Sequence, residues 1–391
     1  MNGSSGSFSL FAQPELLVEP GAFRNLGTLL KKYGYRRPAL VTGGRSVRGR
    51  DEWGALLDSL VEDGFSFLDF TVRGEPGPNV VNDAVRQIRL DAPHTDVVVA
   101  VGGGSALDAG KAIAFGAAAE RGDTFDVTRY LEGVGETPPD GRTLPVVAVP
   151  TTAGTGTEAT RNAVISTTGP GGFKKSLRHE RFVPRYAIID VSLHRGCPPE
   201  IVRASGLDAI TQLLEPYLST GANPLTDALA LTGLRHAGRA FPGLIAGEDS
   251  EEAWTDMAIA AYLSGVCLTS AGLGAVHALA SPAGALRDIP HGVFCGLLVG
   301  PITRATLAST SDSRRDDTRS RYTDAARALG LSADAEGLVE KLYEWSAPLP
   351  RLGSFGFTSE DLDPIAAAAG LKSHPVDLEE QEVISVLEEV L

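Results

Sequence analysis

One acid and two histidines in the second half of the chain are of the types that bind divalent metals. Asp208 and Gln212 are four residues apart, so a helix places both side chains on one face. His277 lies in an apolar run, and His291 follows a proline. An acid with two imidazoles can form a catalytic Zn²⁺ or Fe²⁺ site that leaves a position for substrate. The spacing alone leaves a second interpretation equally open, in which Asp208 belongs to the cap of a helix starting at Ser205 and both histidines are core residues.

A glycine-rich turn follows the most strand-like segment of the chain. Five apolar residues, Val97 to Val101, predict a strand buried on both faces, as in parallel sheets. Three glycines end this strand, and we expect an alanine-rich helix to begin near Ser105 as its N-cap, with Asp108 in the first turn. Backbone N–H groups in such a turn hold a phosphate or pyrophosphate, and the plainer alternative is a tight turn that binds nothing.

Two more turns follow apolar strands in the same half of the chain. Residues 43–46 follow the segment 38–42, and the threonine-rich residues 151–158 follow the segment 144–149. In a parallel sheet, the turns at the carboxyl ends of the strands lie on one edge and can line a single cleft. The three turns together therefore predict a dinucleotide site.

The first of these turns bears on the choice between the two nicotinamide cofactors. NAD sites usually place a carboxylate after a strand to bind the ribose 2′-OH, whereas NADP sites avoid it and add a basic residue. No acid stands between Gly43 and Asp51, while Arg45, Arg48 and Arg50 are basic. This pattern favours NADP(H) over NAD(H), unless the arginines form only a solvated face.

The order of the predicted elements divides the chain in two. Residues 10–195 alternate strand-like and helix-like segments, which predicts a Rossmann-like α/β domain with a parallel sheet. From residue 196 to 391 strand signals largely vanish and helical patterns follow one another, with Asn223 and Pro224 as a helix start. We therefore expect a flexible tail at 1–9, a dinucleotide-binding domain and an all-helical metal and substrate domain.

The composition excludes several classes of partner. The 391 residues carry a net charge of -14, which argues against nucleic acid and anionic membranes as partners. Three scattered cysteines do not make a disulfide framework, so a reducing cytoplasm fits best. The first residues lack the features of a signal peptide. Residues 258–286 are apolar but interrupted by His277 and Pro282, which predicts a buried helical segment instead of a membrane span.

Several motifs resemble one known family. Residues 102–111 look like its pyrophosphate loop, residues 150–158 match its second cofactor loop, and Lys174, ten before Pro184, aligns with a lysine that contacts the cofactor ribose. Asp208 and the two histidines, fourteen residues apart, fall on its metal-ligand positions. From about residue 12 onward the chain resembles the iron-containing (group III) alcohol dehydrogenases, whose relatives include glycerol dehydrogenase and dehydroquinate synthase.

The resemblance implies a dehydroquinate synthase-like architecture, a divalent metal, a nicotinamide cofactor and a homo-oligomer, commonly a dimer. The implied cofactor-binding residues are Gly43, Gly44, Arg45, Ser46, Gly103, Gly104, Ser105, Asp108, Thr151, Thr152, Thr155, Thr157 and Lys174. Two positions depart from the family pattern. Gln212 stands where the family has a metal-binding histidine, and Ser281 replaces the second histidine of a His-x-x-x-His helix. An amide oxygen is a weaker ligand than imidazole for these metals.

These features predict a metal-dependent, NAD(P)-linked alcohol dehydrogenase or aldehyde reductase acting on a small alcohol or aldehyde. Asp208, His277 and His291 are the expected metal ligands, with Gln212 as a weaker fourth, and Ser281 is expected in the proton relay. One alternative is a metal-free reductase similar to maleylacetate reductases. Another is a lyase like dehydroquinate synthase, against which the scarcity of basic residues near the expected ligands counts. A non-catalytic binding protein is the remaining alternative.

Overall fold

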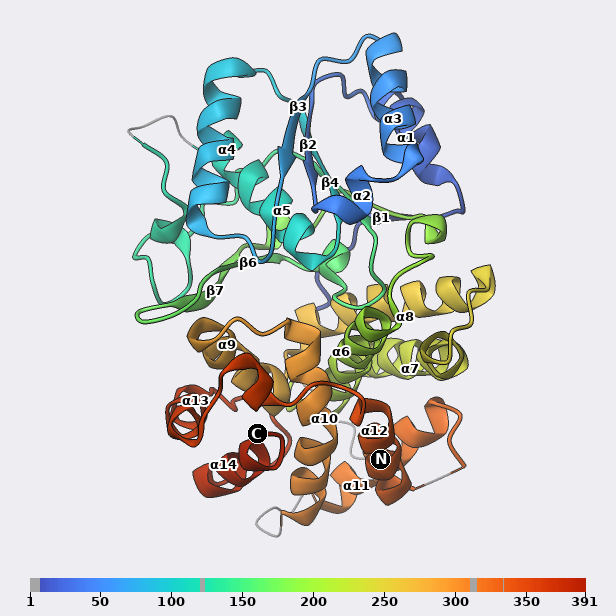
Figure 1. Ribbon diagram of the computed structural model, residues 1–391, viewed down its shortest axis with the longest axis vertical. Coiled ribbons are helices and arrows are strands. Elements are labelled where there is room, and N and C mark those ends of the chain that lie inside the picture. Colours follow the sequence, from blue (N-terminus) through green and yellow to red (C-terminus); the bar gives the residue numbers. More distant parts are fainter. Residues whose placement is uncertain (1–7, 120–123, 310–314, 333) are drawn as a thin grey trace.

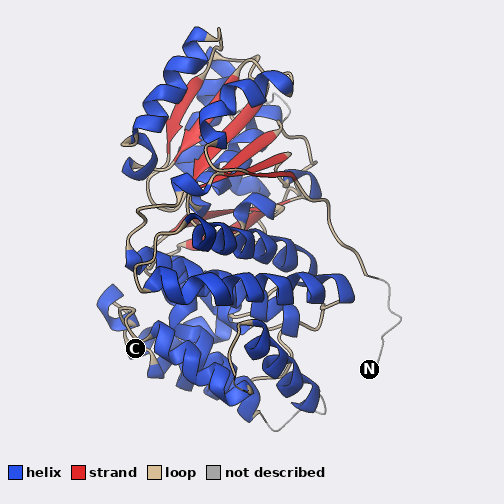
Figure 2. Ribbon diagram, turned by 90° about the vertical axis from the view of Figure 1, so that its right-hand side faces the viewer, coloured by secondary structure: helices blue, strands red, loops and turns tan. Residues whose placement is uncertain are grey.

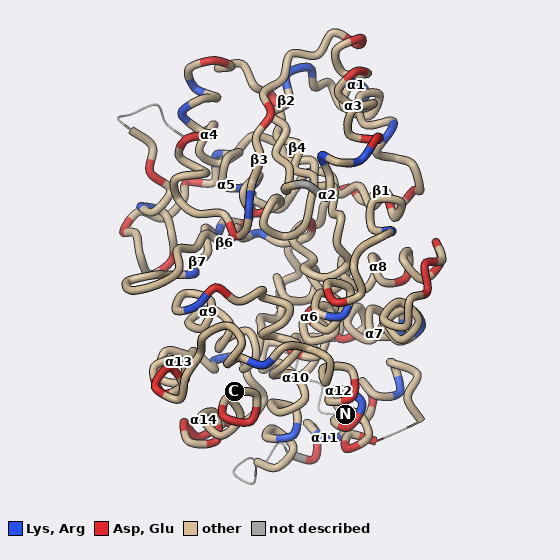
Figure 3. The backbone as a smooth tube through the Cα atoms, in the orientation of Figure 1, with Lys and Arg blue, Asp and Glu red and all other residues tan. Residues whose placement is uncertain are grey.

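The computed structural model describes residues 8–119, 124–309, 315–332 and 334–391. The molecule is elongated, with the sheet-containing half at one end and the helical half at the other (Figure 1). This is the predicted fold class, a Rossmann-like α/β domain followed by an all-helical domain. Most of the predicted tail, residues 1–7, lies outside the described residues. The acid excess is spread over both halves, with basic positions interspersed (Figure 3).

Six parallel strands form the central sheet, in the spatial order β1-β8-β5-β4-β2-β3 (Figure 2). They are β1 (Glu15–Val18), β2 (Pro38–Thr42), β3 (Leu68–Thr71), β4 (Val97–Gly102), β5 (Val146–Pro150) and β8 (Tyr186–Ile189). The strands β2, β4 and β5 are neighbours, and each is followed by one of the three predicted turns. The three turns therefore lie side by side on one edge, as expected.

Helices cover both faces of the sheet. They are α1 (Leu26–Lys32), α2 (Arg45–Arg48), α3 (Asp51–Glu62), α4 (Pro78–Asp91) and α5 (Gly104–Ala118). Alternate residues of β4 point to opposite faces, as the pleat requires. Val98 packs with α4 and α5, whereas Val97, Val99 and Val101 pack with α1 and α3. All six residues of β4 are buried, which explains the unbroken apolar run in the sequence.

The start of α5 differs from the prediction. The helix begins at Gly104 with Gly103 as its N-cap, and no side chain caps it, so Ser105 is not the N-cap. Asp108 consequently lies in the second turn and does not serve the helix dipole. It lies on the buried side instead, where its Oδ1 is 3.3 Å from Nζ of Lys111. Glycine at the cap leaves the first backbone N–H groups free of side-chain partners.

A hairpin that the sequence analysis did not predict follows the third turn. Its antiparallel strands are β6 (Asn162–Thr167) and β7 (Phe173–Arg178). The inward residues Ala163, Ile165 and Leu177 are fully buried and extend the core between the sheet and α5. Four of the six residues of β7 are polar or charged, so the apolar signal of a strand is weak there. The hairpin carries Lys174 towards the helical half.

Nine helices make up the described part of the second half. They are α6 (Pro199–Leu218), α7 (Pro224–Ile245), α8 (Glu251–Ala271), α9 (Ala275–Leu286), α10 (His291–Ala308), α11 (Arg315–Ala328), α12 (Ala335–Ser346), α13 (Leu362–Ala368) and α14 (Glu380–Glu389). Every residue from Gly206 to Leu218 is buried, because α6 packs against α7, α8 and α10. It begins at Pro199 and passes through Ser205, so the predicted helix start at Ser205 is wrong. Asn223 caps α7 as predicted, with Thr226 completing a capping box.

Among the described residues, no single helix is long and apolar enough to cross a membrane. The pair α8 and α9 reaches that length and composition together, but the two helices meet at an angle of 95°.

Glycines allow the two halves to touch backbone to backbone. A Cβ atom built on Gly265 of α8 comes within 2.0 Å of the carbonyl oxygen of Gly156, in the third turn. A Cβ on Gly154 would lie 2.5 Å from Cβ of Ser205 on α6. The third turn is therefore pressed directly onto the helices that follow it.

We predict that Gly265→Ala destabilises the protein, since the added methyl group meets backbone that cannot move aside. Overpacking of this kind costs about 1–3 kcal/mol, so the thermal midpoint should fall by several degrees. Gly54→Ala is the matched control, because Gly54 is an exposed position in α3 with open space around it. That change should leave the midpoint unchanged or raise it slightly. Equal midpoints for both variants would contradict the close approach of the two halves.

Candidate active site

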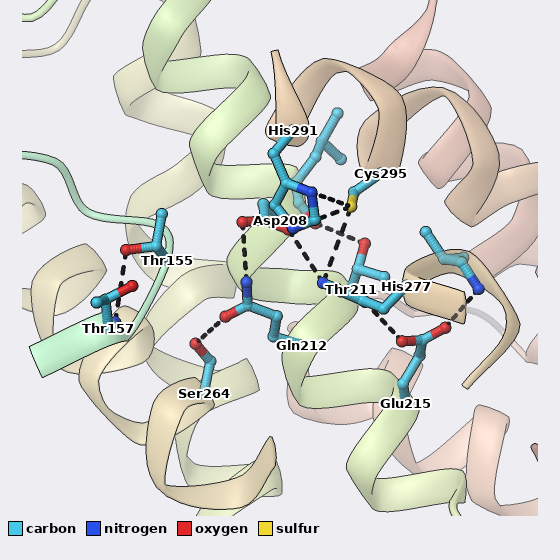
Figure 4. A network of polar contacts seen from close by, with 12 residues as sticks. Thr155, Thr157, Asp208, Thr211, Gln212, Glu215, Ser264, His277, His291 and Cys295 are labelled. Carbon is cyan, nitrogen blue, oxygen red and sulfur yellow. Dashed lines mark hydrogen bonds and ion pairs between the residues drawn. The ribbon is translucent and has the colours of Figure 1, made fainter. Parts of the chain in front are cut away.

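Four side chains from three helices converge in the helical half (Figure 4). Asp208 comes from α6, His277 from α9, and His291 and Cys295 from the first turns of α10. One donor atom from each lies within 4.8 Å of the others. Oδ1 of Asp208 is 3.3 Å from Nε2 of His277 and 3.7 Å from Nε2 of His291. The three predicted ligands thus meet, and Cys295 joins them.

The chemistry of this cluster fits a divalent cation. Oδ1 of Asp208 is buried and makes no hydrogen bond to any described residue. Burial by itself raises the pKa of Asp208, but the interactions with His291 and His277 outweigh this effect and hold the pKa below its usual value. Burial lowers the pKa of His291 to about 4, so its ring is neutral and has a lone pair to offer. The carboxylate of Asp208 and the neutral ring of His291 are both donors that bind divalent cations. A bound cation would also stabilise the buried negative charge.

Gln212 was predicted as a weak metal ligand, but its amide makes hydrogen bonds instead. Its Nε2 donates to Oδ2 of Asp208 at 2.8 Å. Its Oε1 accepts from the hydroxyl of Ser264 on α8, also at 2.8 Å. The amide oxygen therefore points towards Ser264 and away from the two histidines (Figure 4). In this arrangement Gln212 orients the carboxylate of Asp208.

Glu215 performs a similar task for His277. One turn beyond Gln212 on α6, its Oε2 lies 2.6 Å from Nδ1 of His277, while its Oε1 accepts from the backbone N–H of Val276 at 2.7 Å. A carboxylate on Nδ1 fixes the ring so that Nε2 faces the cluster. Behind it, the buried His374 accepts from the backbone N–H of Ala275 at 3.3 Å.

Two of these residues were not predicted, although the sequence carries a signal for each. Glu215 lies seven residues after Asp208, and Cys295 lies four after His291, so each shares a helix face with a predicted ligand. Both stand in apolar helical runs, where a cysteine or a single acid gives little indication of its partners.

The three turns touch one another at the edge of the sheet. Gly102 has a φ of +153°, and a Cβ there would lie 3.1 Å from the backbone nitrogen of Gly43. A Cβ on Gly103 would lie 3.4 Å from Oγ1 of Thr152, and one on Gly104 would lie 3.0 Å from Cγ2 of Thr155. Glycine is required most clearly at 102, where φ is positive and a Cβ would also lie 2.7 Å from Cβ of Ala106. This packing leaves the uncapped start of α5 between the first and third turns.

Lys111 holds the third turn in place from behind. Its ammonium is buried and donates to the carbonyl oxygen of Thr157 at 3.0 Å and to Oγ1 of Thr160 at 2.8 Å. Burial lowers its pKa, while the charge of Asp108 acts in the opposite direction. Asp108 was predicted among the cofactor-binding residues, and the ion pair with Lys111 places it beneath the turn. Burial also raises the pKa of Glu158 to about 7.

Two of the three arginines near the first turn have other partners. Arg48 donates to Oγ1 of Thr42 at 2.8 Å and pairs with Asp69. Arg50 donates to the carbonyl oxygens of Ser192, Leu193 and Arg195. The side chain of Arg45 lies outside the described residues. The predicted preference for NADP(H) therefore depends on Arg45 and on the absence of a carboxylate at Gly43 and Gly44.

Lys174 and Ser281 lie between the two halves. Lys174 pairs with Glu75, which also accepts from Ser166 at 2.9 Å. A Cβ on Gly284 of α9 would lie 3.0 Å from Cδ of Lys174, so this lysine packs on the helix that carries His277. Ser281 is exposed, one turn along α9 from His277. The hairpin that carries Lys174 therefore packs on the helix that carries His277 and Ser281.

A parallel sheet with such turns, facing a carboxylate–imidazole cluster in a helical domain, defines the class of two-domain, nicotinamide-linked dehydrogenases. Residues 13–191 match the family model described as iron-containing alcohol dehydrogenase. Residues 202–391 match the C-terminal model of the same family. The chain belongs to the iron-containing alcohol dehydrogenase family. It is an oxidoreductase acting on CH–OH groups, and the family implies a divalent metal and an NAD(P) cofactor.

Individual relatives cover nearly the whole chain. It is 31% identical to alcohol dehydrogenase 4 of Saccharomyces cerevisiae strain YJM789 over 376 residues, 94% of each chain. It is 34% identical to lactaldehyde reductase of Escherichia coli K12 over 367 residues, 89% of each. Among solved structures, a 1,3-propanediol oxidoreductase superimposes with a TM-score of 0.83 at 29% identity, covering 99% of this chain and 100% of that one.

We predict that Glu215→Ala weakens metal binding by about 10–100-fold, because Nδ1 of His277 loses the carboxylate that orients its ring. Titration of metal-free protein with Zn²⁺ measures the change. Glu200→Ala, at an exposed position on the same helix, is the control and should bind like the wild type. Unchanged affinity in the Glu215 variant would show that the ring needs no such support.

Proposed function

We propose that this protein is a metal-dependent alcohol dehydrogenase or aldehyde reductase that prefers NADP(H) and acts on a small alcohol or aldehyde between its two domains. The observation that carries this proposal is the convergence of Asp208, His277 and His291 within 4.8 Å. The third turn supports it, since Gly154 packs on Ser205, one turn before Asp208 on α6. Cofactor and metal would then meet across this contact.

The proposed cofactor residues surround the start of α5. Free backbone N–H groups at Gly103, Gly104 and Ser105 suit the pyrophosphate. Threonine hydroxyls of the third turn, which are Thr151, Thr152, Thr155 and Thr157, suit ribose and phosphate oxygens. Lys174 is proposed at the nicotinamide ribose, and its charge also reaches His291.

The preference for NADP(H) is proposed from the first turn. No carboxylate stands at Gly43, Gly44 or Ser46, and Arg45 is the basic residue left for a 2′-phosphate. Two relatives argue for the opposite preference. The NAD-dependent methanol dehydrogenase of Bacillus methanolicus is 29% identical, and the sulfoacetaldehyde reductase of Bifidobacterium kashiwanohense, at 25% identity, was crystallised in complex with NAD⁺. The preference for one cofactor is therefore tested with both NADPH and NADH.

The chain's own residues prepare the reaction. A divalent cation held by Asp208, His277 and His291 would supply Lewis-acid polarisation, and a nicotinamide bound at the three turns would supply or accept the hydride. Gln212 holds Asp208, and Glu215 holds His277, so the donor atoms need little reorganisation. Ser281 stands in place of the family's second histidine, and we place it in the proton relay because it shares a face of α9 with His277. We also place the chain in a sub-branch of the family on the basis of Gln212, which stands in place of a histidine.

We also propose a homodimer working in the cytoplasm. The free thiols of Cys197, Cys267 and Cys295 fit a reducing compartment.

The deciding experiment measures NADPH and NADH oxidation against a panel of small aldehydes, before and after metal removal verified by elemental analysis. We expect turnover with NADPH that is lost on removal and restored by Zn²⁺ or Fe²⁺. Turnover that survives verified removal would identify a metal-free reductase. Metal-loaded protein without net cofactor oxidation would point to the lyase or the binding protein.

We predict that Gly43→Asp lowers kcat/KM with NADPH by about tenfold, which corresponds to roughly 1.4 kcal/mol of repulsion on the 2′-phosphate. Space around Gly43 is open, so the new side chain fits without strain. Activity with NADH in the same variant is the internal control and should hold or rise. A fall with both cofactors, or with neither, would contradict the assigned role of this turn.

A further inference from the structure

Cys295 lies beside the three expected metal ligands, for which the sequence analysis found no strong fourth ligand. It is fully buried in α10, one turn after His291. Its Sγ is 3.8 Å from Nε2 of His277 and 3.7 Å from Nε2 of His291. The thiol thus faces the same space as the unpartnered Oδ1 of Asp208 (Figure 4).

The distances match the edges of a tetrahedron around a metal. Nitrogen and oxygen ligands at about 2.0–2.1 Å and sulfur at about 2.3 Å are separated from one another by roughly 3.3–3.7 Å. Asp208 lies 3.3 and 3.7 Å from the two imidazole nitrogens, and Cys295 lies 3.8 and 3.7 Å from them. Each of these four edges therefore agrees to within a few tenths of an ångström.

The other residue available for the fourth position is already engaged. Gln212 uses its amide nitrogen on Asp208 and its amide oxygen on Ser264. A rotated amide would place its oxygen against Oδ2 of Asp208, so that two acceptors would face each other at the position of the present hydrogen bond. The hydrogen bonds of Gln212 consequently favour the thiol as the fourth donor.

We propose that Cys295, as a thiolate, is the fourth protein ligand of the metal, with Asp208, His277 and His291. When the Sγ–metal bond forms, the thiol proton leaves to the solvent. A soft sulfur donor in a tetrahedral set favours Zn²⁺ over Fe²⁺. Four protein donors also hold the ion more tightly than three, and a substrate oxygen would have to enter as a fifth ligand. This inference rests on the proposed function only in placing a metal at the cluster.

The test uses the full chain loaded with Co²⁺, a spectroscopic substitute for Zn²⁺. Thiolate ligation gives a near-ultraviolet charge-transfer band that oxygen and nitrogen donors do not give. We expect this band with one equivalent of Co²⁺ in the wild type and in Cys267→Ser, and its loss in Cys295→Ser. Cys267 is the matched control, because it is equally buried and its Sγ lies 3.6 Å from the carbonyl oxygen of Thr226. The affinity of Cys295→Ser for Zn²⁺ should fall at least about tenfold.

A wild-type protein that binds one equivalent of Co²⁺ without the band would overturn the proposal, and this result needs no variant to fold. Persistence of the band in Cys295→Ser would do the same. Failure of the proposed function looks different. In that case the band appears as expected, but neither NADPH nor NADH is oxidised with any aldehyde of the panel.

Discussion

The structure of the helical domain depends on one buried carboxylate. A buried, ionised carboxylate is stable only if each oxygen has a polar or charged partner. Without such partners, the free-energy cost of removing the charge from water exceeds the stabilisation gained from packing. Asp208 has Gln212 on one oxygen, and its other oxygen faces the two imidazoles. The helices α6, α9 and α10 must meet at Asp208 to bring the carboxylate and the two imidazoles together. The apolar packing around α6 holds them there, and a divalent cation, as the family implies, would balance the charge of the carboxylate.

The same principle extends outward from the cluster. Gln212 depends on Ser264 of α8, and His277 depends on Glu215, which also receives the N–H of Val276 near the start of α9. Gln212 and His277 are thereby each fixed by a polar group on a different helix. In the other domain, Lys111 fixes the carbonyl oxygens of the third turn in a comparable way. Close glycine contacts then connect the fixed turn to α6 and α8, so the edge of the sheet that carries the turn packs on the helix that carries Asp208.

The sequence was most informative where chemistry and local periodicity agree. The apolar runs of β2, β4 and β5, each followed by a polar or glycine-rich turn, predicted the sheet edge. The acid and the two histidines left two interpretations open, and the resemblance to a known family favoured the cluster. The sequence was least informative where a side chain depends on a distant partner. The amide of Gln212 is oriented by a serine 52 residues away, and Cys295 resembles any buried thiol until α9 brings His277 beside it. Ser205 has good capping chemistry, but Pro198 and Pro199 start the helix earlier and packing carries α6 through it.

The most direct test of the account is the metal content of purified protein, compared between the wild type and Asp208→Asn. The account predicts one divalent ion per chain in the wild type and almost none in the variant, because the amide removes the charge that the cluster balances. Equal metal content in the two proteins, each folded to the same extent by circular dichroism, would contradict it.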